Sequence, residues 1–291
     1  MTHDLLIHPI AHIRTDFPSK FGIPRQAGLA EALEGIVVFE PEFRVDEALR
    51  GIEGFSHLWL IWGFSENAGH DWTPTVRPPR LGGNTRMGVF ATRSPFRPNG
   101  LGLSCVTLLS LRKDETLGTT LIVAGADMVD GTPIYDIKPY IPYADSVPDA
   151  VGGFAPDAGR VLQVDFPPEL EEKVPPEKRG GLRAVLSHDP RPRYQDDPDR
   201  IYGMGFAGLE VRFRVESEVL TVTEIESDES STHETGAGAS CRYTGSRCQF
   251  TVSLRKSVPG VSVFPSWESL CRILPRPRRP HNNPAGSDTH R

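Results

Sequence analysis

The side chains best suited to chemistry lie between Trp72 and Lys113, where seven basic residues occur without a single Asp or Glu. The whole chain carries a formal net charge of -6, so this stretch is basic against an acidic background. Within it stand the arginines Arg77, Arg80, Arg86, Arg93 and Arg97. A guanidinium is a rigid, planar fork of donors that suits phosphate and carboxylate oxygens. The stretch therefore predicts a bound anion, either an RNA or a nucleotide-like cofactor.

The backbone around these arginines is rich in proline and glycine. Prolines adjoin Arg77, Arg80 and Arg97 and restrict the main chain, while the glycines between them allow a ligand to approach it closely. The ordinary alternative is a solvated surface loop, since surface charges often have no specific partner. The density of arginines and the absence of carboxylates favour an anion site. Because the whole chain is acidic, any contact with RNA must be local.

A second candidate is the segment 127–140, which contains the sequence Asp-Gly-Thr-Pro followed by Ile-Tyr-Asp-Ile-Lys. Asp-Gly-Thr-Pro predicts a tight turn, and the alternation of a strand then places Asp136 and Lys138 on one face. Such a pair can be a simple surface ion pair. The functional alternative is a carboxylate near a reacting proton, with a lysine that holds an anion. His57 also has two interpretations, and its apolar neighbours favour a packed residue over a catalyst.

The segment 203–208 matches the G-x-G-x-x-G fingerprint of doubly wound nucleotide-binding folds. That fingerprint needs a buried strand before it and a helix after it. Here a polar, proline-containing segment precedes it and the strand-like residues 209–215 follow. A doubly wound fold is therefore not predicted.

The cysteines do not predict a metal site. Cys241, Cys248 and Cys271 lack the short paired spacing of zinc ligands. Cys105 lies in an apolar stretch and predicts a buried thiol. We expect no bound metal.

The elements that must position these side chains are mainly short strands. The apolar and β-branched runs are residues 5–13, 35–39, 57–64, 87–91, 103–111, 119–124 and 134–137. Turn-rich segments separate them, with one short helix expected at 45–51, which favours an antiparallel barrel or sandwich over βαβ units. The 27 prolines and 28 glycines agree with a loop-rich, β-leaning chain.

The second half changes character after about residue 148. Residues 167–173 and 176–186 predict helices, and residues 211–215 and 219–225 predict a hairpin. The fold prediction is thus mainly β (α+β). It comprises an antiparallel β-barrel domain at 5–148, a small α+β lobe at 149–226 and a disordered tail at 227–291. With no apolar run long enough for a membrane span and no secretory signal, we expect a cytoplasmic protein without a membrane partner.

Five segments that occur in one order carry a resemblance to a known family. They are residues 24–28 (Pro-Arg-Gln-Ala-Gly), 55–59 (Phe-Ser-His-Leu-Trp), 77–84 (Arg-Pro-Pro-Arg-Leu-Gly-Gly-Asn), 86–94 (Arg-Met-Gly-Val-Phe-Ala-Thr-Arg-Ser) and 130–140. Together they resemble the TsaA-like family of TrmO-type tRNA methyltransferases. The similarity is dense over about residues 5–148 and thinner to about 225. The chain departs from the family pattern at Gly100-Leu101 and at 208–210.

The resemblance implies an S-adenosylmethionine-dependent enzyme that methylates N6 of threonylcarbamoyl-adenosine next to the anticodon of tRNA. It also implies a homodimer with the cofactor near the subunit interface. By the same resemblance, the cofactor pocket comprises Arg25, Gln26, Ala27, Ser65, Glu66, Arg93, Leu103, Gly131, Thr132, Pro133 and Ile134. The tRNA phosphates and the threonyl carboxylate are assigned to Arg77, Arg80, Arg86, Arg97 and Lys138. Asp136 is the candidate general base.

Two other functions remain open from the sequence. One is a non-catalytic RNA- or nucleotide-binding module that keeps the basic stretch without chemistry. The other is a methyltransferase of the same fold that acts on a different small substrate. Binding of S-adenosylmethionine separates the first from an enzyme.

Overall fold

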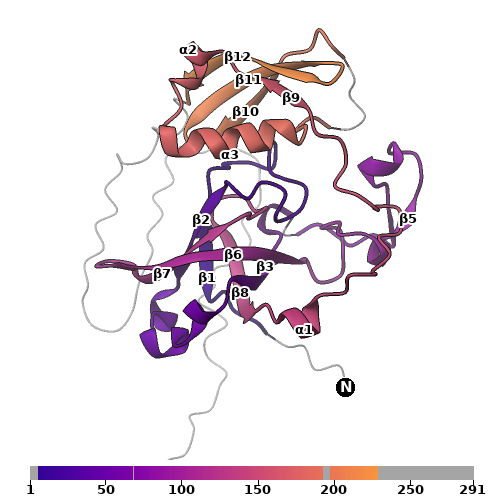
Figure 1. The fold of residues 1–291 in the computed structure, drawn as a ribbon. Helices are drawn as coiled ribbons and strands as arrows, with labels where there is room; N and C mark the ends of the chain where they lie inside the picture. The colour runs from indigo at the N-terminus through magenta and orange to yellow at the C-terminus, as the bar shows by residue number, and fades with distance from the viewer. Residues whose placement is uncertain (1–5, 68, 193–196, 229–291) are drawn as a thin grey trace, which may run out of the picture. The chain divides into compact units, whose positions relative to one another are not determined.

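Six strands close into a barrel in the order β1-β2-β7-β6-β3-β8, with β8 pairing back to β1 (Figure 1). The computed structural model describes residues 6–67, 69–192 and 197–228. The six strands are β1 (Ala11–Arg14), β2 (Glu34–Phe39), β3 (His57–Gly63), β6 (Leu101–Asp114), β7 (Gly118–Ala124) and β8 (Thr132–Pro139). All neighbouring pairs are antiparallel. The prediction of a mainly β fold with antiparallel sheets and a few helices is confirmed.

The alternation of side chains along these strands fills the barrel. Residues such as Ile13, Leu58, Leu60, Leu121 and Ile134 are completely buried in one hydrophobic cluster. Their neighbours in sequence point outward, as the two-residue period of a strand requires. Truncating one of these side chains, for example by Leu58→Ala, typically costs about 2–5 kcal/mol of stability. The barrel is therefore a rigid support for the residues on its outer face and at its ends.

A four-stranded sheet with the order β10-β11-β12-β9 follows the barrel in sequence. Its strands are β9 (Gln163–Asp165), β10 (Tyr202–Phe206), β11 (Leu209–Glu216) and β12 (Val219–Ser227), with helices α2 (Pro168–Glu171) and α3 (Pro176–Ser187). Phe17, Ala30 and Leu33 share a buried cluster with residues of this sheet and of α3. The two parts are thus joined by a common core.

The expected helix at 176–186 and the expected hairpin after residue 208 are confirmed by α3 and by the β11–β12 pair. The glycines of the segment 203–208 lie in β10 and in its turn to β11, where Gly208 has a φ of 76°. This segment is a hairpin and not a phosphate-binding turn. The expected helix at 167–173 is shorter, since α2 spans Pro168–Glu171.

Two strand predictions are wrong in part. Residues 87–91 do not form one strand, because only β5 (Met87–Gly88) pairs, with β4 (Thr75–Val76), and a 3-10 helix follows at Val89–Ala91. The Thr92 hydroxyl donates to the Val89 carbonyl at 2.9 Å and stabilises that turn. At the N-terminus, the described residues 6–10 of the expected strand lie outside β1, which begins at Ala11, and Pro9 has no N–H to donate to a ladder.

The remaining elements are short. They are the 3-10 helices at Pro41–Phe43, Asp46–Leu49, Ile52–Gly54, Ser65–Asn67 and Pro79–Leu81, and the single α-helical turn α1 (Pro142–Asp145). The helix expected at 45–51 is thus the 3-10 turn Asp46–Leu49. Across the described ranges, no helix has the length and apolar character to cross a membrane. The predicted tail, with Cys241, Cys248 and Cys271, lies outside the described residues except at its start.

Candidate functional site

The segment from Gln26 to Gly28 is held by residues that are distant in sequence. The Arg93 guanidinium donates to the Gln26 side-chain oxygen. The Gly28 amide donates to the Gly125 carbonyl at 2.9 Å. The Ala27 amide stabilises the charged form of the Asp127 carboxylate. The structure therefore brings together Gln26, Ala27 and Arg93, which the resemblance places in one pocket.

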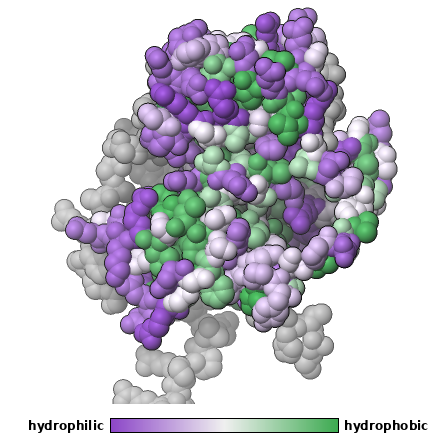
Figure 2. All heavy atoms as spheres, in the orientation of Figure 1, coloured by the Kyte–Doolittle hydropathy of each residue, from purple (hydrophilic) through white to green (hydrophobic). Residues whose placement is uncertain are grey.

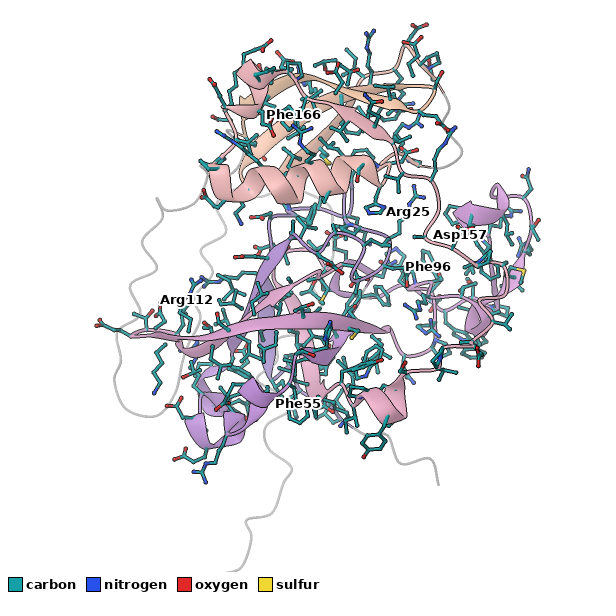
Figure 3. All side chains as sticks on the ribbon, in the orientation of Figure 1. Arg25, Phe55, Phe96, Arg112, Asp157 and Phe166 are labelled. Carbon is teal, nitrogen blue, oxygen red and sulfur yellow. The ribbon has the colours of Figure 1, made fainter. Side chains whose placement is uncertain are left out.

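Arg25 at the start of this segment is held by the chain that leaves α3 (Figure 3). Its guanidinium donates to the carbonyl oxygens of Asp189 at 3.1 Å and of Arg191 at 2.8 Å. Asp189 has a φ of 51°, and its carboxylate accepts two hydrogen bonds from the buried Arg191 guanidinium. Arg25 thus links the segment 26–28, which is expected to bind the cofactor, to the C-terminal part of the chain.

Asp127 is a candidate site residue that the sequence analysis did not single out. It follows β7 and a short apolar stretch, and its carboxylate accepts a hydrogen bond from the Ser104 hydroxyl at 2.5 Å. The Trp62 indole donates to the same hydroxyl at 2.9 Å. Burial raises the pKa of Asp127, and the Ser104 hydrogen bond and the Arg93 charge oppose that rise. The available signal was an Asp placed between Ala126 and Met128, where a solvated charge is not expected.

Asp136 and Lys138 lie on the same face of β8, as predicted. Lys138 Nζ is 2.8 Å from Asp136 Oδ2, and both side chains are about half exposed. Ile61 of β3 is paired with Asp136 on one side and with Leu103 of β6 on the other. Asp136, the candidate base, and Leu103, which is expected to contact the cofactor, therefore lie on either side of Ile61 on the outer face of the barrel.

The residues 131–134 are placed at the start of β8. The side chains of Thr132 and Ile134 are buried, and the Thr132 hydroxyl donates to the Val129 carbonyl at 2.8 Å. Gly131 has a φ of 75°, a conformation that favours glycine, and its amide donates to the Ile13 carbonyl at 2.8 Å. A ligand at this turn would have to contact the main chain or Pro133 rather than the two buried side chains.

Ser65 and Glu66 form a 3-10 turn after β3 together with Asn67. Lys20 holds this turn, because its Nζ lies 3.3 Å from Glu66 Oε2 and 2.5 Å from Asn67 Oδ1. The side chain of Glu66 is thus paired with Lys20 and not with Arg93.

Three arginines of the basic stretch, Arg80, Arg86 and Arg97, already bond to other groups of the protein. Arg80 donates to the Asp157 carboxylate at 3.1 Å and to the Asp157 carbonyl at 2.7 Å (Figure 3). Arg97 donates to the carbonyl of Thr92 at 3.1 Å, and Arg86 donates to the Thr75 hydroxyl at 2.9 Å. The sequence could not indicate Asp157, which lies far beyond the carboxylate-free stretch. These bonds use some of the guanidinium donors and leave others for an anion.

The basic stretch also carries exposed side chains close in sequence to these arginines. Arg77 is exposed, and within the described residues its side chain makes no hydrogen bond or ion pair. Phe90 is 75% exposed on the rigid turn Val89–Ala91, and Trp72 is half exposed. Exposed aromatic rings among arginines are typical of surfaces that bind single-stranded nucleic acid, because bases stack on the rings.

Cys105 corrects one prediction, since its thiol is half-buried on the outward side of β6 rather than in the core. Desolvation raises the pKa of this thiol, and the nearby Asp145 carboxylate adds to the rise. The residue is paired with Trp59, whose indole donates to Asp145 at 3.1 Å. His57 is half-buried and its ring lies 6.1 Å from the ring of Tyr140, as expected for a packed residue.

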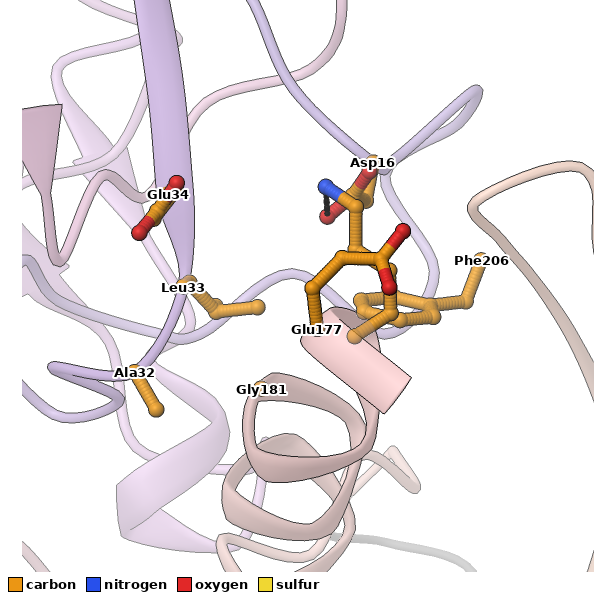
Figure 4. Close-up of a pocket in the computed structure, with 8 residues that line it drawn as sticks. Asp16, Ala32, Leu33, Glu34, Glu177, Gly181 and Phe206 are labelled. Atoms are coloured by element: carbon orange, nitrogen blue, oxygen red, sulfur yellow. Dashed lines mark hydrogen bonds and ion pairs between the residues drawn. The ribbon is translucent and has the colours of Figure 1, made fainter. Parts of the chain in front are cut away.

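A small cavity lies away from all these residues, at the start of α3 (Figure 4). Its volume is about 30 Å³, and the Lys178–Asp16 ion pair at 2.7 Å closes one side. This cavity has room for one or two water molecules but not for a nucleotide-sized ligand. Within the described ranges, no group of His, Cys, Asp and Glu side chains is arranged to hold a metal ion.

Comparisons with known proteins show which family the chain is similar to. The family described as the tRNA-methyltransferase O N-terminal domain matches residues 12–146, and the TrmO C-terminal domain family matches residues 160–228. A tRNA (adenine(37)-N6)-methyltransferase of Escherichia coli (strain K12) is 42% identical over 217 residues, which cover 71% of this chain and 91% of that protein. The enzyme of the same description from Eikenella corrodens is 51% identical over 164 residues, which cover 56% of this chain and 92% of that protein.

Similarity at the level of structure extends over both parts of the chain. The crystal structure of TrmO from Pseudomonas aeruginosa matches with a TM-score of 0.62 and 34% sequence identity. The match covers 78% of this chain and 100% of that structure. With matches to both domains and an E. coli relative covered over most of its length, the chain belongs to the TrmO family of tRNA methyltransferases.

Proposed function

We propose that the protein transfers a methyl group from S-adenosylmethionine to N6 of adenosine 37 of tRNA, on a base that already carries a threonylcarbamoyl group. The observation that carries the proposal is the grouping of Gln26, Ala27 and Arg93 near the half-buried Asp127 carboxylate, in a chain of the TrmO family. Relatives named tRNA (adenine(37)-N6)-methyltransferase support the choice of nucleotide.

The residues around Gln26 suit a ligand that carries both a carboxylate and an adenosine. The Arg93 guanidinium can bind a carboxylate through its planar fork, and Leu103, which is 53% exposed, offers an apolar surface. When bound, S-adenosylmethionine supplies a methyl group from its sulfonium centre. The other proposed contacts are Arg25, Gln26, Ala27, Ser65, Glu66, Gly131, Thr132, Pro133 and Ile134. Arg25 would act by holding the segment in place, and Thr132 and Ile134 would act through their main chain.

Methylation removes one proton from N6, and Asp136 is the proposed acceptor of that proton. The acyl substituent on N6 withdraws electron density and makes this proton more acidic, so a carboxylate is a sufficient base. The ion pair of Asp136 with Lys138 holds the carboxylate on the outer face of β8. A general base typically contributes about 10²–10⁴-fold to a rate, so we expect Asp136→Asn to lower kcat by an amount in that range.

The tRNA would bind along the basic stretch. Arg77, Arg80, Arg86 and Arg97 are proposed to take backbone phosphates, with Lys138 near the threonyl carboxylate. Because Arg80 and Arg97 also hold loop carbonyls, Arg77 and Arg86 have more donors available for RNA. We also propose that the protein acts in the cytoplasm, since its proposed substrate is a tRNA.

A homodimer is proposed from the outer face of the barrel. Leu103 and Leu109 of β6 are 53% and 48% exposed, and Leu103 is paired with Ile61 of β3. In the view of Figure 2, hydrophobic residues gather over the middle of the barrel, where Figure 1 draws β6. An exposed apolar patch of this kind supports an interface between subunits. It would place Leu103 and Asp136 close to the second subunit.

The proposed domain boundaries are 5–148 for the methyltransferase barrel, 149–226 for the α+β lobe and 227–291 for a tail outside the catalytic unit. The family matches at 12–146 and 160–228 support the first two.

Calorimetric titration with S-adenosylmethionine, followed by a methyl-transfer assay on tRNA, tests the proposal. We expect saturable binding of the cofactor and methylation that Asp136→Asn slows. A protein that binds tRNA but gives no heat with S-adenosylmethionine would be a non-catalytic RNA-binding module. A protein that binds the cofactor but transfers no methyl group to tRNA would be a methyltransferase for another substrate.

A further inference from the structure

A chain of hydrogen bonds runs from the buried Trp62 through the buried Ser104 to the half-buried Asp127, and the proposed transfer step does not use it. Trp62 and Ser104 are only 8% and 2% exposed. Their side chains bond at 2.9 Å, and Ser104 bonds to the Asp127 carboxylate at 2.5 Å. Buried polar groups without a partner are costly, so a satisfied chain of this kind is a rigid feature of the barrel.

The chemistry of the donors fixes the direction of these bonds. An indole N–H can only donate, so the Ser104 oxygen must accept from Trp62. The single hydroxyl hydrogen of Ser104 is therefore directed to Asp127, whose oxygen accepts it. This arrangement fixes one oxygen of the carboxylate and thereby its orientation.

The Asp127 carboxylate lies close to the segment 26–28, which is expected to bind the cofactor. The Ala27 amide and the positive charge of Arg93 both stabilise its ionised form. Arg93 in turn donates to the Gln26 side chain, and the Gly28 amide donates to the Gly125 carbonyl, two residues before Asp127. The loop that carries Asp127 is thus bonded to the segment 26–28 at Gly28.

We propose that Asp127 is a positioning residue for cofactor binding. Held by Trp62 and Ser104, it fixes the Ala27 main chain and orients the Arg93 guanidinium toward Gln26. This inference rests on the proposed function, because it assumes that Gln26, Ala27 and Arg93 bind S-adenosylmethionine.

The proposal predicts an effect on cofactor affinity more than on the rate of transfer. Asp127→Asn keeps the size of the side chain but removes its charge and one of its acceptor oxygens. We expect the Kd and KM for S-adenosylmethionine to rise about ten- to a hundredfold, as for the loss of one charge-assisted contact. The value of kcat at saturating cofactor should change much less. Ser104→Ala should raise the same KM by a smaller factor.

A pH profile separates positioning from a purely structural effect. Burial raises the pKa of Asp127, so the carboxylate is protonated before ordinary carboxylates as the pH falls. Among the described residues, Arg93 is the charged side chain whose field lowers that pKa. In the wild type, the KM for S-adenosylmethionine should therefore rise toward acid pH, and Asp127→Asn should lack this rise.

Asp114→Asn is the matched control, because Asp114 is likewise an Asp that accepts hydrogen bonds, but at the β6–β7 turn and away from residues 26–28. It should leave the KM for S-adenosylmethionine unchanged. An Asp127→Asn variant with wild-type KM and a wild-type pH profile would overturn the proposal. If Asp127→Asn does not fold, a Ser104→Ala variant with wild-type KM would overturn it instead. A wild-type protein that binds no S-adenosylmethionine would reject the proposed function itself, which is a different outcome.

Discussion

The Arg25 guanidinium donates to the main-chain oxygen of Arg191 at 2.8 Å, across 166 residues of sequence. Arg25 belongs to the part of the chain that matches the N-terminal TrmO domain, and Arg191 belongs to the part that matches the C-terminal domain. Through this contact, the C-terminal part holds the segment that is proposed to bind S-adenosylmethionine. We infer that the C-terminal part supports the cofactor pocket as well as any contact with RNA.

The first prediction concerns this contact. Arg25→Ala should raise the KM for S-adenosylmethionine about tenfold, since two hydrogen bonds from a charged donor are lost. Steady-state kinetics with varied cofactor measure the effect. Arg160→Ala is a suitable control, because the pair that Arg160 forms among the described residues is an exposed one, with Glu218 at 3.4 Å. If both variants have the same KM, Arg25 does not position the segment.

The second prediction concerns Arg93, whose guanidinium binds the Gln26 side chain and is attracted to Asp127. Arg93→Ala should weaken binding of S-adenosylmethionine about ten- to a hundredfold, because one charge-assisted contact typically contributes about 1.5–3 kcal/mol. Calorimetric titration gives the Kd, and a melting curve checks that the fold is kept. An unchanged Kd would remove Arg93 from the pocket.

The third prediction concerns binding of tRNA. Each phosphate contact contributes a slope of about -0.7 to -0.9 to the logarithmic dependence of affinity on salt. Arg77→Ala should flatten the measured slope by about one contact and leave the melting temperature unchanged. Arg80→Ala should flatten the slope too and should also lower the melting temperature, since Arg80 holds the loop at Asp157. An affinity that does not depend on salt would exclude the basic stretch as the RNA surface.

The sequence predicted the elements whose side chains follow a clear period. The buried residues of β3 and β7, the amphipathic α3 and the shared face of Asp136 and Lys138 all follow from local pattern. The basic stretch was also visible as a local absence of carboxylates. These features depend on near neighbours, which a sequence displays directly.

Features that depend on distant residues were not predictable. Asp157 pairs with Arg80, and Ser104 fixes Asp127, but no local pattern connects either pair. A strand was predicted at Val89–Ala91, where the structure has a 3-10 turn. The apolar residues there have the composition of a strand, and the sequence does not show whether a neighbouring strand is present to pair with them. Cys105 was expected in the core because the irregular pattern of β6 did not show which side faces outward.

The fourth prediction concerns stability against acid. Hydrogen bonds from the Leu117 amide and from Thr116 lower the pKa of Asp114 in the folded protein. The unfolded chain therefore takes up this proton first as the pH falls, and the stabilising contribution of Asp114 is lost as the pH falls through the folded-state pKa. Asp114→Asn should melt at a lower temperature than the wild type at pH 6. The two proteins should converge near pH 2, and a difference of the same size at both pH values would contradict this account.

The most direct test of the central claim is the product formed on defined tRNA. Purified protein is incubated with S-adenosylmethionine and tRNA that either carries or lacks the threonylcarbamoyl group, and the nucleosides are then analysed by mass spectrometry. We predict one added methyl group on N6 of the threonylcarbamoyl-adenosine at position 37, and none on tRNA that lacks the modification. A methyl group at another nucleotide, or equal methylation of both tRNAs, would contradict the proposed substrate.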